Sequence, residues 1–122
     1  MPDESGSSAA REAARRDMAL MMEAAAKLRD DIHAHVEVNR KVVEALEQVG
    51  ALGAALERVQ AGRARMTLTD SLAHYELLRH RARLSLMAVG VEEGMTVADV
   101  AEHWEISRQL AARYLRDIEQ GH

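Results

Sequence analysis

The chain has 122 residues, 48% of them apolar, with a formal net charge of −4, one proline, one tryptophan, two tyrosines and no phenylalanine or cysteine. This length fits one domain, or a small domain with a helical arm, and the abundance of Ala, Leu, Met, Glu and Arg predicts an all-α protein. The lack of cysteine excludes disulfides, thiolate metal sites and cysteine nucleophiles, and no apolar run approaches the roughly 18 residues of a membrane span.

The N-terminal residues predict a tail rather than a targeting signal. Residues 1–8 are small, polar and acidic, and they lack the apolar stretch of a signal peptide. We therefore expect residues 1–8 to be disordered and the protein to be soluble and cytoplasmic, with no contact to a membrane.

A long helix is predicted from Ala9 to about Val49, because this stretch contains no glycine or proline. Its apolar residues recur at steps of three and four, which is the pattern of a heptad seam. The members of this seam are Met18, Met21, Ala25, Leu28, Ile32, Val42, Leu46 and Val49, with His35 and Asn39 as polar residues in the same register. We expect residues 9–65 to form a coiled-coil or bundle region that makes a homodimer.

Two breaks are predicted beyond this helix. The glycines at positions 50 and 53 indicate a bend, and the stretch from Gly62 to Thr69 indicates a second break with Thr67 or Thr69 capping a new helix. That helix should run to Gly90 with one apolar face, formed by Leu72, Tyr75, Leu78, Ala82, Leu86 and Val89. Arg79, Arg81 and Arg83 should then point largely toward solvent, and residues 91–95 should form a loop.

The last segment, TVADVAEHWEISRQLAARYLRDI, reads as a helix, a tight turn and a second helix. Thr96 and Ser107 are the expected N-caps, with Asp99 completing a capping-box variant. The first helix has an apolar stripe of Val97, Val100, Ala101 and Trp104, and the second has an inner face of Ala111, Leu115 and Ile118 with Tyr114 at its edge. Trp104 is expected to plug the core of this small unit.

This pattern resembles the helix-turn-helix of bacterial transcriptional regulators. The matching positions are Thr96, Val100, Ala101, Trp104, Glu105, Ile106, Ser107, Leu110, Ala111, Arg113, Leu115 and Ile118. With Leu84 to Val89 as a preceding helix, the resemblance spans about a third of the chain, and this tri-helical unit resembles the core of winged-helix regulators. We expect residues 66–122 to form the helix-turn-helix DNA-binding region. The sequence departs from them at Glu105, which replaces a usual glycine in the turn, and we expect no conventional wing after the second helix.

The resemblance implies that the second helix lies in the DNA major groove. Its outward residues would contact base edges, because arginine can bond guanine, glutamine can bond adenine, and an alanine methyl can touch thymine. These residues are Ser107, Arg108, Gln109, Ala112, Arg113 and Arg116. Thr96 would hold a phosphate at its helix start, and Arg79, Arg81 and Arg83 are either phosphate contacts or a solvated face.

Simpler interpretations apply to the same residues. Arg108, Arg113 and Arg116 can be a solvated face paired with Glu105, Asp117 or Glu119, although the helix-turn-helix context favours DNA contact. The acidic surplus of residues 84–122, seven Asp+Glu against three Lys+Arg, favours a protein partner over DNA. His33 and His35 are two apart on a helix and therefore face different ways, so we expect no metal site. No catalytic or cofactor signature stands out, so we expect no enzyme and no cofactor.

Two functions follow from these observations. The leading prediction is a small dimeric regulator of transcription that binds double-stranded DNA through the helix after Ser107. The alternative is a coiled-coil adaptor whose tri-helical end binds a protein, such as a sigma factor or a phage component, and not DNA.

Overall fold

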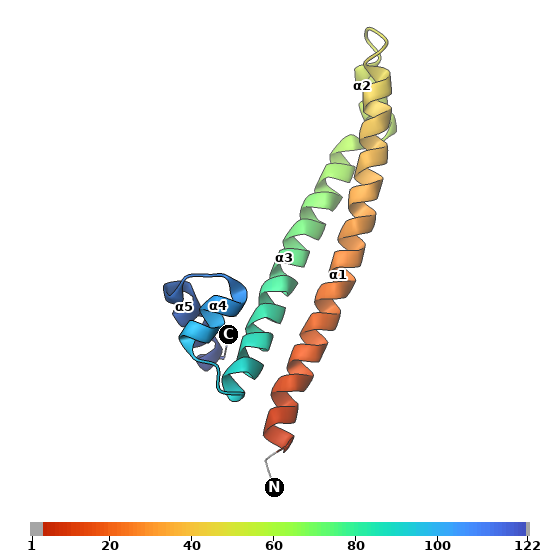
Figure 1. The fold of residues 1–122 in the computed structure, drawn as a ribbon. Helices are drawn as coiled ribbons and strands as arrows, with labels where there is room; N and C mark the ends of the chain where they lie inside the picture. Colours follow the sequence, from red (N-terminus) through yellow and green to blue (C-terminus); the bar gives the residue numbers. More distant parts are fainter. Residues whose placement is uncertain (1–3, 122) are drawn as a thin grey trace. The chain divides into compact units, whose positions relative to one another are not determined.

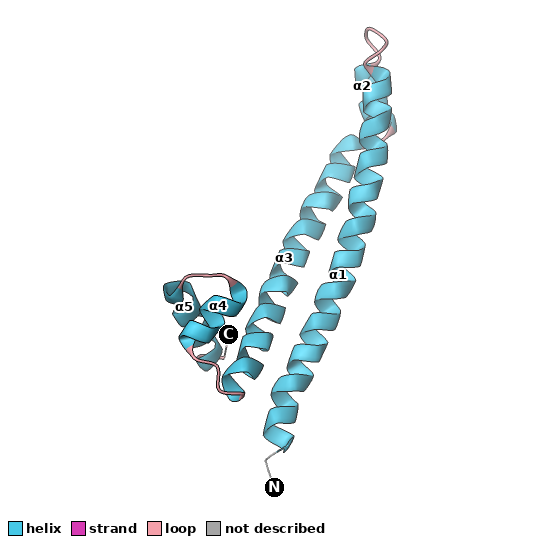
Figure 2. Ribbon diagram, viewed as in Figure 1, coloured by secondary structure: helices cyan, strands magenta, loops and turns pink. Residues whose placement is uncertain are grey.

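A computed structural model of the chain describes residues 4–121, with side chains from Ala9 onward. Within this range the chain folds into helices and loops without a strand, which confirms the all-α prediction (Figures 1 and 2). The helices are α1 (Glu4–Ala45), α2 (Leu52–Arg58), α3 (Ala61–Glu92), α4 (Val97–Trp104) and α5 (Arg108–Glu119). None of these helices is long and apolar enough to cross a membrane.

Two compact units make up the chain. One comprises the residues up to Met21 together with those from Leu78 onward, and the other spans Met22–Leu77. The domain boundary expected at residues 65 and 66 therefore falls inside α3, which is continuous from Ala61 to Glu92.

The start of α1 differs from the expected tail. The helix begins at Glu4, whereas disorder was predicted through residue 8, and residues 1–3 of that tail lie outside the described range. Adding a turn to a helix that already exists costs far less than nucleating one, because each further residue gains a hydrogen bond. A small polar segment can therefore continue a helix that its own composition would not start.

The breaks in the Met22–Leu77 unit fall earlier than predicted. Helix α1 ends at Ala45 and is followed by turns that pass through Gly50, whose φ is +84°. The second break lies at Gln60 (φ 51°), and α3 has already started at Ala61. Thr69 does not cap a helix, because its hydroxyl donates to the Arg65 carbonyl oxygen one turn earlier, at 3.0 Å. A threonine can satisfy its hydroxyl inside a helix in this way, so its presence does not mark a helix start.

The face of α1 that is covered in this unit is shifted from the predicted seam. Ala24 is buried, and partly buried residues continue its stripe at steps of three and four: Leu28, Asp31, His35, Val38, Val42 and Ala45. Three predicted members, Leu28, His35 and Val42, belong to this stripe. Ile32, Asn39 and Leu46 are exposed instead, and the Asn39 amide donates to the His35 carbonyl oxygen of its own helix at 2.9 Å.

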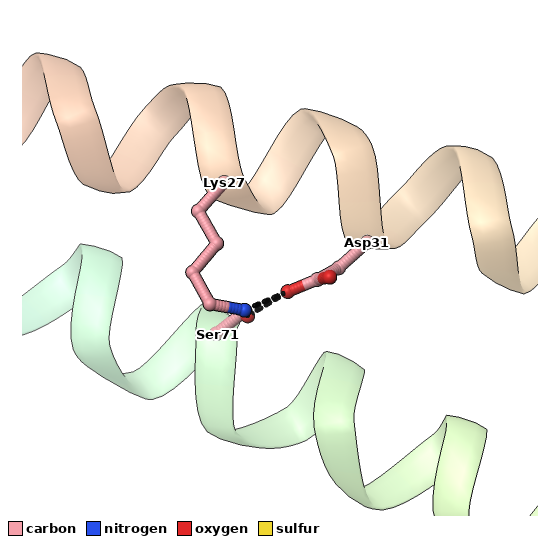
Figure 3. Close-up of polar contacts among 3 residues, drawn as sticks. All are labelled: Lys27, Asp31 and Ser71. Carbon is pink, nitrogen blue, oxygen red and sulfur yellow. Dashed lines mark hydrogen bonds and ion pairs between the residues drawn. The ribbon is translucent and has the colours of Figure 1, made fainter.

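A polar cluster joins α1 to α3 within the same unit (Figure 3). The Lys27 ammonium lies 2.7 Å from Asp31, whose side chain is 18% exposed, and donates to the Ser71 hydroxyl at 3.3 Å. The buried Ser71 hydroxyl donates to the same carboxylate. The hydrogen bond from Lys27 and then that from Ser71 lower the pKa of Asp31, so this carboxylate stays charged where the two helices meet.

The other unit holds a small core built from α3, α4 and α5. Its centre consists of Met87, Val100 and Ala111, all 0% exposed, with Ala101 beside them. Trp104 packs against this group as predicted but is only partly buried, so it lies at the edge of the core and not at its centre. Met87 takes that place, because a flexible methionine can fill the gap between three helices that cross at different angles.

The predicted single apolar face of α3 is also corrected. Leu86 is 36% exposed and Leu72 is exposed in the other unit, whereas Leu84 and Met87 are buried. In the unit that begins at Leu78, the C-terminal part of α3 packs on two sides: Ser85 donates to the buried Asp17 carboxylate of α1, while Met87 faces α4 and α5. A helix with two neighbours has two partial apolar stripes, and a one-face pattern merges them.

Candidate nucleic-acid interface

Helix α4 begins with a complete capping box, as the sequence predicts. The Thr96 hydroxyl accepts from the Asp99 N–H at 3.2 Å, and the Asp99 carboxylate accepts from the Thr96 N–H at 2.8 Å. The hydrogen bond from the Thr96 backbone, followed by that with its side chain, lowers the pKa of Asp99. The Thr96 N–H is therefore engaged with the Asp99 carboxylate and the Thr96 hydroxyl with the Asp99 N–H, and the predicted phosphate contact at this helix start stays a prediction.

The turn between α4 and α5 depends on Glu105. This residue is left-handed (φ 53°, ψ 46°), and the Ile106 N–H bonds the Ala101 carbonyl oxygen at 3.0 Å. A six-to-one bond of this kind across a left-handed residue is a Schellman motif, which most often uses glycine. Ile106 also packs against the core that contains Ala101, so an apolar contact accompanies the bond. The turn expected of a helix-turn-helix therefore forms although glycine is absent.

Helix α5 starts at the predicted cap and buries the predicted face. The Ser107 hydroxyl accepts from the Leu110 N–H at 3.0 Å. Ala111 is fully buried, and Tyr114, Leu115 and Ile118 pack around the core from the same helix. The inner face of α5 and its first turn are thus fixed by contacts within this unit, which leaves the opposite face for other contacts.

Tyr114 connects α5 to α3 through two basic residues. The Arg83 guanidinium donates to the Tyr114 hydroxyl at 3.1 Å and lies 5.7 Å from the centre of its ring. The His80 ring is 5.5 Å from the same ring. Arg83 is therefore partly buried and committed to Tyr114, which corrects its predicted place on a solvated face. Sequence spacing alone does not reveal this contact, because it joins residues 31 positions apart.

The outward face of α5 carries the predicted base-reading residues. Arg108, Gln109, Arg113 and Arg116 are exposed, and Ala112 is partly buried at the edge of this face. None of the three arginines forms an ion pair with another described residue. The expected alternative of pairing with Glu105, Asp117 or Glu119 is therefore not the arrangement that the structure adopts.

The remaining predicted contacts lie on α3. Arg79 and Arg81 are exposed on this helix, as expected for either a solvated face or a phosphate contact. They differ from Arg83, which faces α5. Of the predicted trio, two are thus on the surface and one holds the candidate reading helix in place.

The described residues offer little for small-molecule chemistry. They contain no group of three or more His, Asp or Glu side chains placed to hold a metal. A hollow of about 550 Å³ lies in the Met22–Leu77 unit and is open, with Glu37, Lys41, Glu44 and Arg58 among its lining residues. Its mixed charges favour no single ligand class.

Comparisons with known proteins indicate no family or function for the chain. No family model, curated protein or solved structure matches the chain.

Proposed function

We propose that the chain is a bacterial, cytoplasmic regulator of transcription that binds double-stranded DNA as a homodimer and reads the major groove with α5. The observation that carries this proposal is the division of α5 into two faces. Its inner face packs in the core of α3, α4 and α5, and its outer face presents Arg108, Gln109, Arg113 and Arg116 without intramolecular ion pairs.

The chemistry of the outer face suits bases more than phosphates alone. Arginine can donate two parallel hydrogen bonds to guanine, and Gln109 can donate to and accept from adenine. Because these guanidinium groups form no internal ion pair among the described residues, no such pair has to break when they bind DNA. The binding free energy is therefore not reduced by the loss of an internal contact. The cap at Ser107 and the contact between Arg83 and Tyr114 fix the helix that presents them.

The acidic residues of this region limit binding that ignores sequence. Residues 84–122 hold seven Asp and Glu against three Lys and Arg, and the exposed Glu102 and Glu105 lie close to the turn. Carboxylates near a DNA surface oppose phosphate contacts. We therefore expect weak binding to random duplexes and a larger share of the affinity from base contacts.

A selection experiment tests the proposal. The protein is titrated with duplexes selected from a random library, and with fragments upstream of its own gene, at several salt concentrations. We expect one sequence class to bind more tightly than a scrambled duplex, with an affinity that falls as salt rises. Equal affinity for selected and scrambled duplexes would contradict sequence reading, and no binding at low salt would contradict DNA binding altogether.

A protein-binding adaptor is the second candidate, and the acidic residues near the turn favour it. In that case the outer face of α5 binds an acidic protein surface. Capture of a protein partner that depends on Arg113, together with no DNA affinity, would replace the proposal with the adaptor.

A further inference from the structure

The Met22–Leu77 unit has almost no apolar core of its own. The structure describes every residue of this range, and the only buried apolar side chains in it are those of Ala24 and Ala55. Large apolar side chains are exposed on all three of its helices, including Leu52 and Leu56 of α2 and Met66 and Leu77 of α3. Helices owe most of their stability in proteins to packing, so a unit with two buried alanines needs another surface to cover it.

In the Met22–Leu77 unit, exposed large apolar residues of α1 and the turn after it form a second seam, separate from the covered stripe. They are Met22, Ile32, Val36, Val43 and Leu46, and their exposed fractions run from 45% to 63%. Ala25, Arg29 and Asn39 complete a series with steps of three and four from residue 22 to 46. We call these eight residues the outer seam. Such a repeat places every member along one side of a helix that pairs with another helix.

We propose that the outer seam binds the outer seam of a second copy of this chain, with the two α1 helices antiparallel. The two polar members indicate this occupant. Arg29 and Asn39 lie five residues on either side of position 34. A twofold axis at that position places Arg29 opposite Asn39 of the second copy, and the contact occurs twice by symmetry.

This arrangement matches every polar residue with a polar one. The side-chain carbonyl oxygen of Asn39 can accept a hydrogen bond from the Arg29 guanidinium, which can only donate hydrogen bonds. The same axis places Met22 opposite Leu46, Ala25 opposite Val43 and Ile32 opposite Val36, so all other contacts in the seam are apolar. A parallel pair in register would instead oppose Arg29 to itself, and like charges in a seam repel.

The length of the seam is sufficient for pairing. Residues 22–46 span about 36 Å at the usual helical rise of about 1.5 Å per residue. That length covers more than three heptads, which is the range in which a heptad pattern indicates a coiled coil. The inference rests on the outer seam and not on DNA binding, so either can fail without the other.

Sedimentation equilibrium at tens of micromolar tests the pairing. We expect the wild-type chain to be a dimer and Val43→Glu to weaken its association at least tenfold. Val43 is 62% exposed in the single chain and lies outside the covered stripe, so this change leaves that stripe intact. Ala34→Glu is the matched control, because Ala34 is also exposed but lies outside the seam, and it should remain a dimer. A monomeric wild-type chain, or equal weakening by both variants, overturns the proposal.

Introduced cysteines test the orientation, since the natural chain has none. The double variant Ala25→Cys/Val43→Cys should form disulfide-linked dimers on oxidation. Val43→Cys alone should not, because the proposed axis separates it from its counterpart by 18 residues, about 27 Å of helix. A disulfide needs Cα atoms within about 7 Å. Efficient cross-linking of the single variant would show parallel pairing and overturn the antiparallel arrangement.

Discussion

Glu105 holds a backbone conformation that glycine adopts without a steric cost. Its left-handed φ of 53° places the Cβ atom close to the following carbonyl group, at a cost of about 1–2 kcal/mol for a residue other than glycine. The same residue puts a carboxylate at the turn before the candidate reading helix. Its two effects, backbone strain and negative charge, can be separated by substitution.

We expect Glu105→Gly to raise the free energy of unfolding by up to about 1 kcal/mol, because relief of strain exceeds the added freedom of the unfolded chain. Glu105→Gln is the matched control: it removes the charge but keeps the strain, so stability should not rise. Both variants should bind DNA more tightly than the wild type. Thermal unfolding and DNA titration measure the two effects, and an equal gain in stability from both variants would contradict the assignment of strain.

Asp99 provides a test of the capping box through pH. Because its pKa is lowered below 3.8 in the folded chain, its charge stabilises the fold at neutral pH. This contribution is complete above the unfolded value and is lost as pH falls through the folded value. The thermal midpoint of Asp99→Asn should therefore lie below that of the wild type at pH 7, and the gap should close as pH falls below about 4. A gap that persists at pH 2 would contradict this account.

At the scale of helices, Met87 is the residue on which the core of α3, α4 and α5 depends. It is 0% exposed, and its neighbour Leu86 is 36% exposed. We expect Met87→Ala to cost about 2–5 kcal/mol and Leu86→Ala much less, although both remove an apolar side chain of similar size. Chemical denaturation of the two variants measures the difference. Equal losses would mean that the centre of this core lies elsewhere.

Sequence predicts the parts of these helices that depend on near neighbours. The caps at Thr96 and Ser107 were predicted because each bond spans three residues, and the burial of Ala111 follows from the periodicity of α5. The role of Met87 and the contact between Arg83 and Tyr114 were not predicted. Both depend on which helices meet in space, and that information is absent from a local pattern.

The shifted seam of α1 has the same origin. Apolar residues occupy two stripes on this helix, and a single heptad repeat takes members from both, such as Leu28 and Ile32. The hydrogen bond from Ser71 of α3 to Asp31 marks the covered stripe, and it joins residues 40 positions apart, beyond the reach of a local pattern. The exposed apolar residues of the predicted repeat, such as Ile32 and Leu46, belong to the outer seam.

For the whole molecule, a homodimer implies that the free energy of unfolding depends on the protein concentration. Association stabilises a folded chain by mass action, because the partner binds the folded state and not the unfolded one. We expect the thermal midpoint of the wild type to rise between about 1 and 100 micromolar, and that of Val43→Glu to stay lower and change less. Calorimetry over this range provides the measurement. A midpoint that is independent of concentration would argue against the dimer.

The central claim, that α5 reads DNA bases, is tested most directly by one titration series. The wild type, Arg113→Ala and Arg81→Ala are each titrated with a selected and a scrambled duplex at several salt concentrations. Arg113→Ala should lose about 1–3 kcal/mol of binding free energy on the selected duplex and little on the scrambled one. Arg81→Ala, an exposed arginine of α3, should weaken both alike and lower the salt slope by about one if it contacts phosphate. Unchanged affinity of Arg113→Ala for the selected duplex would contradict the claim.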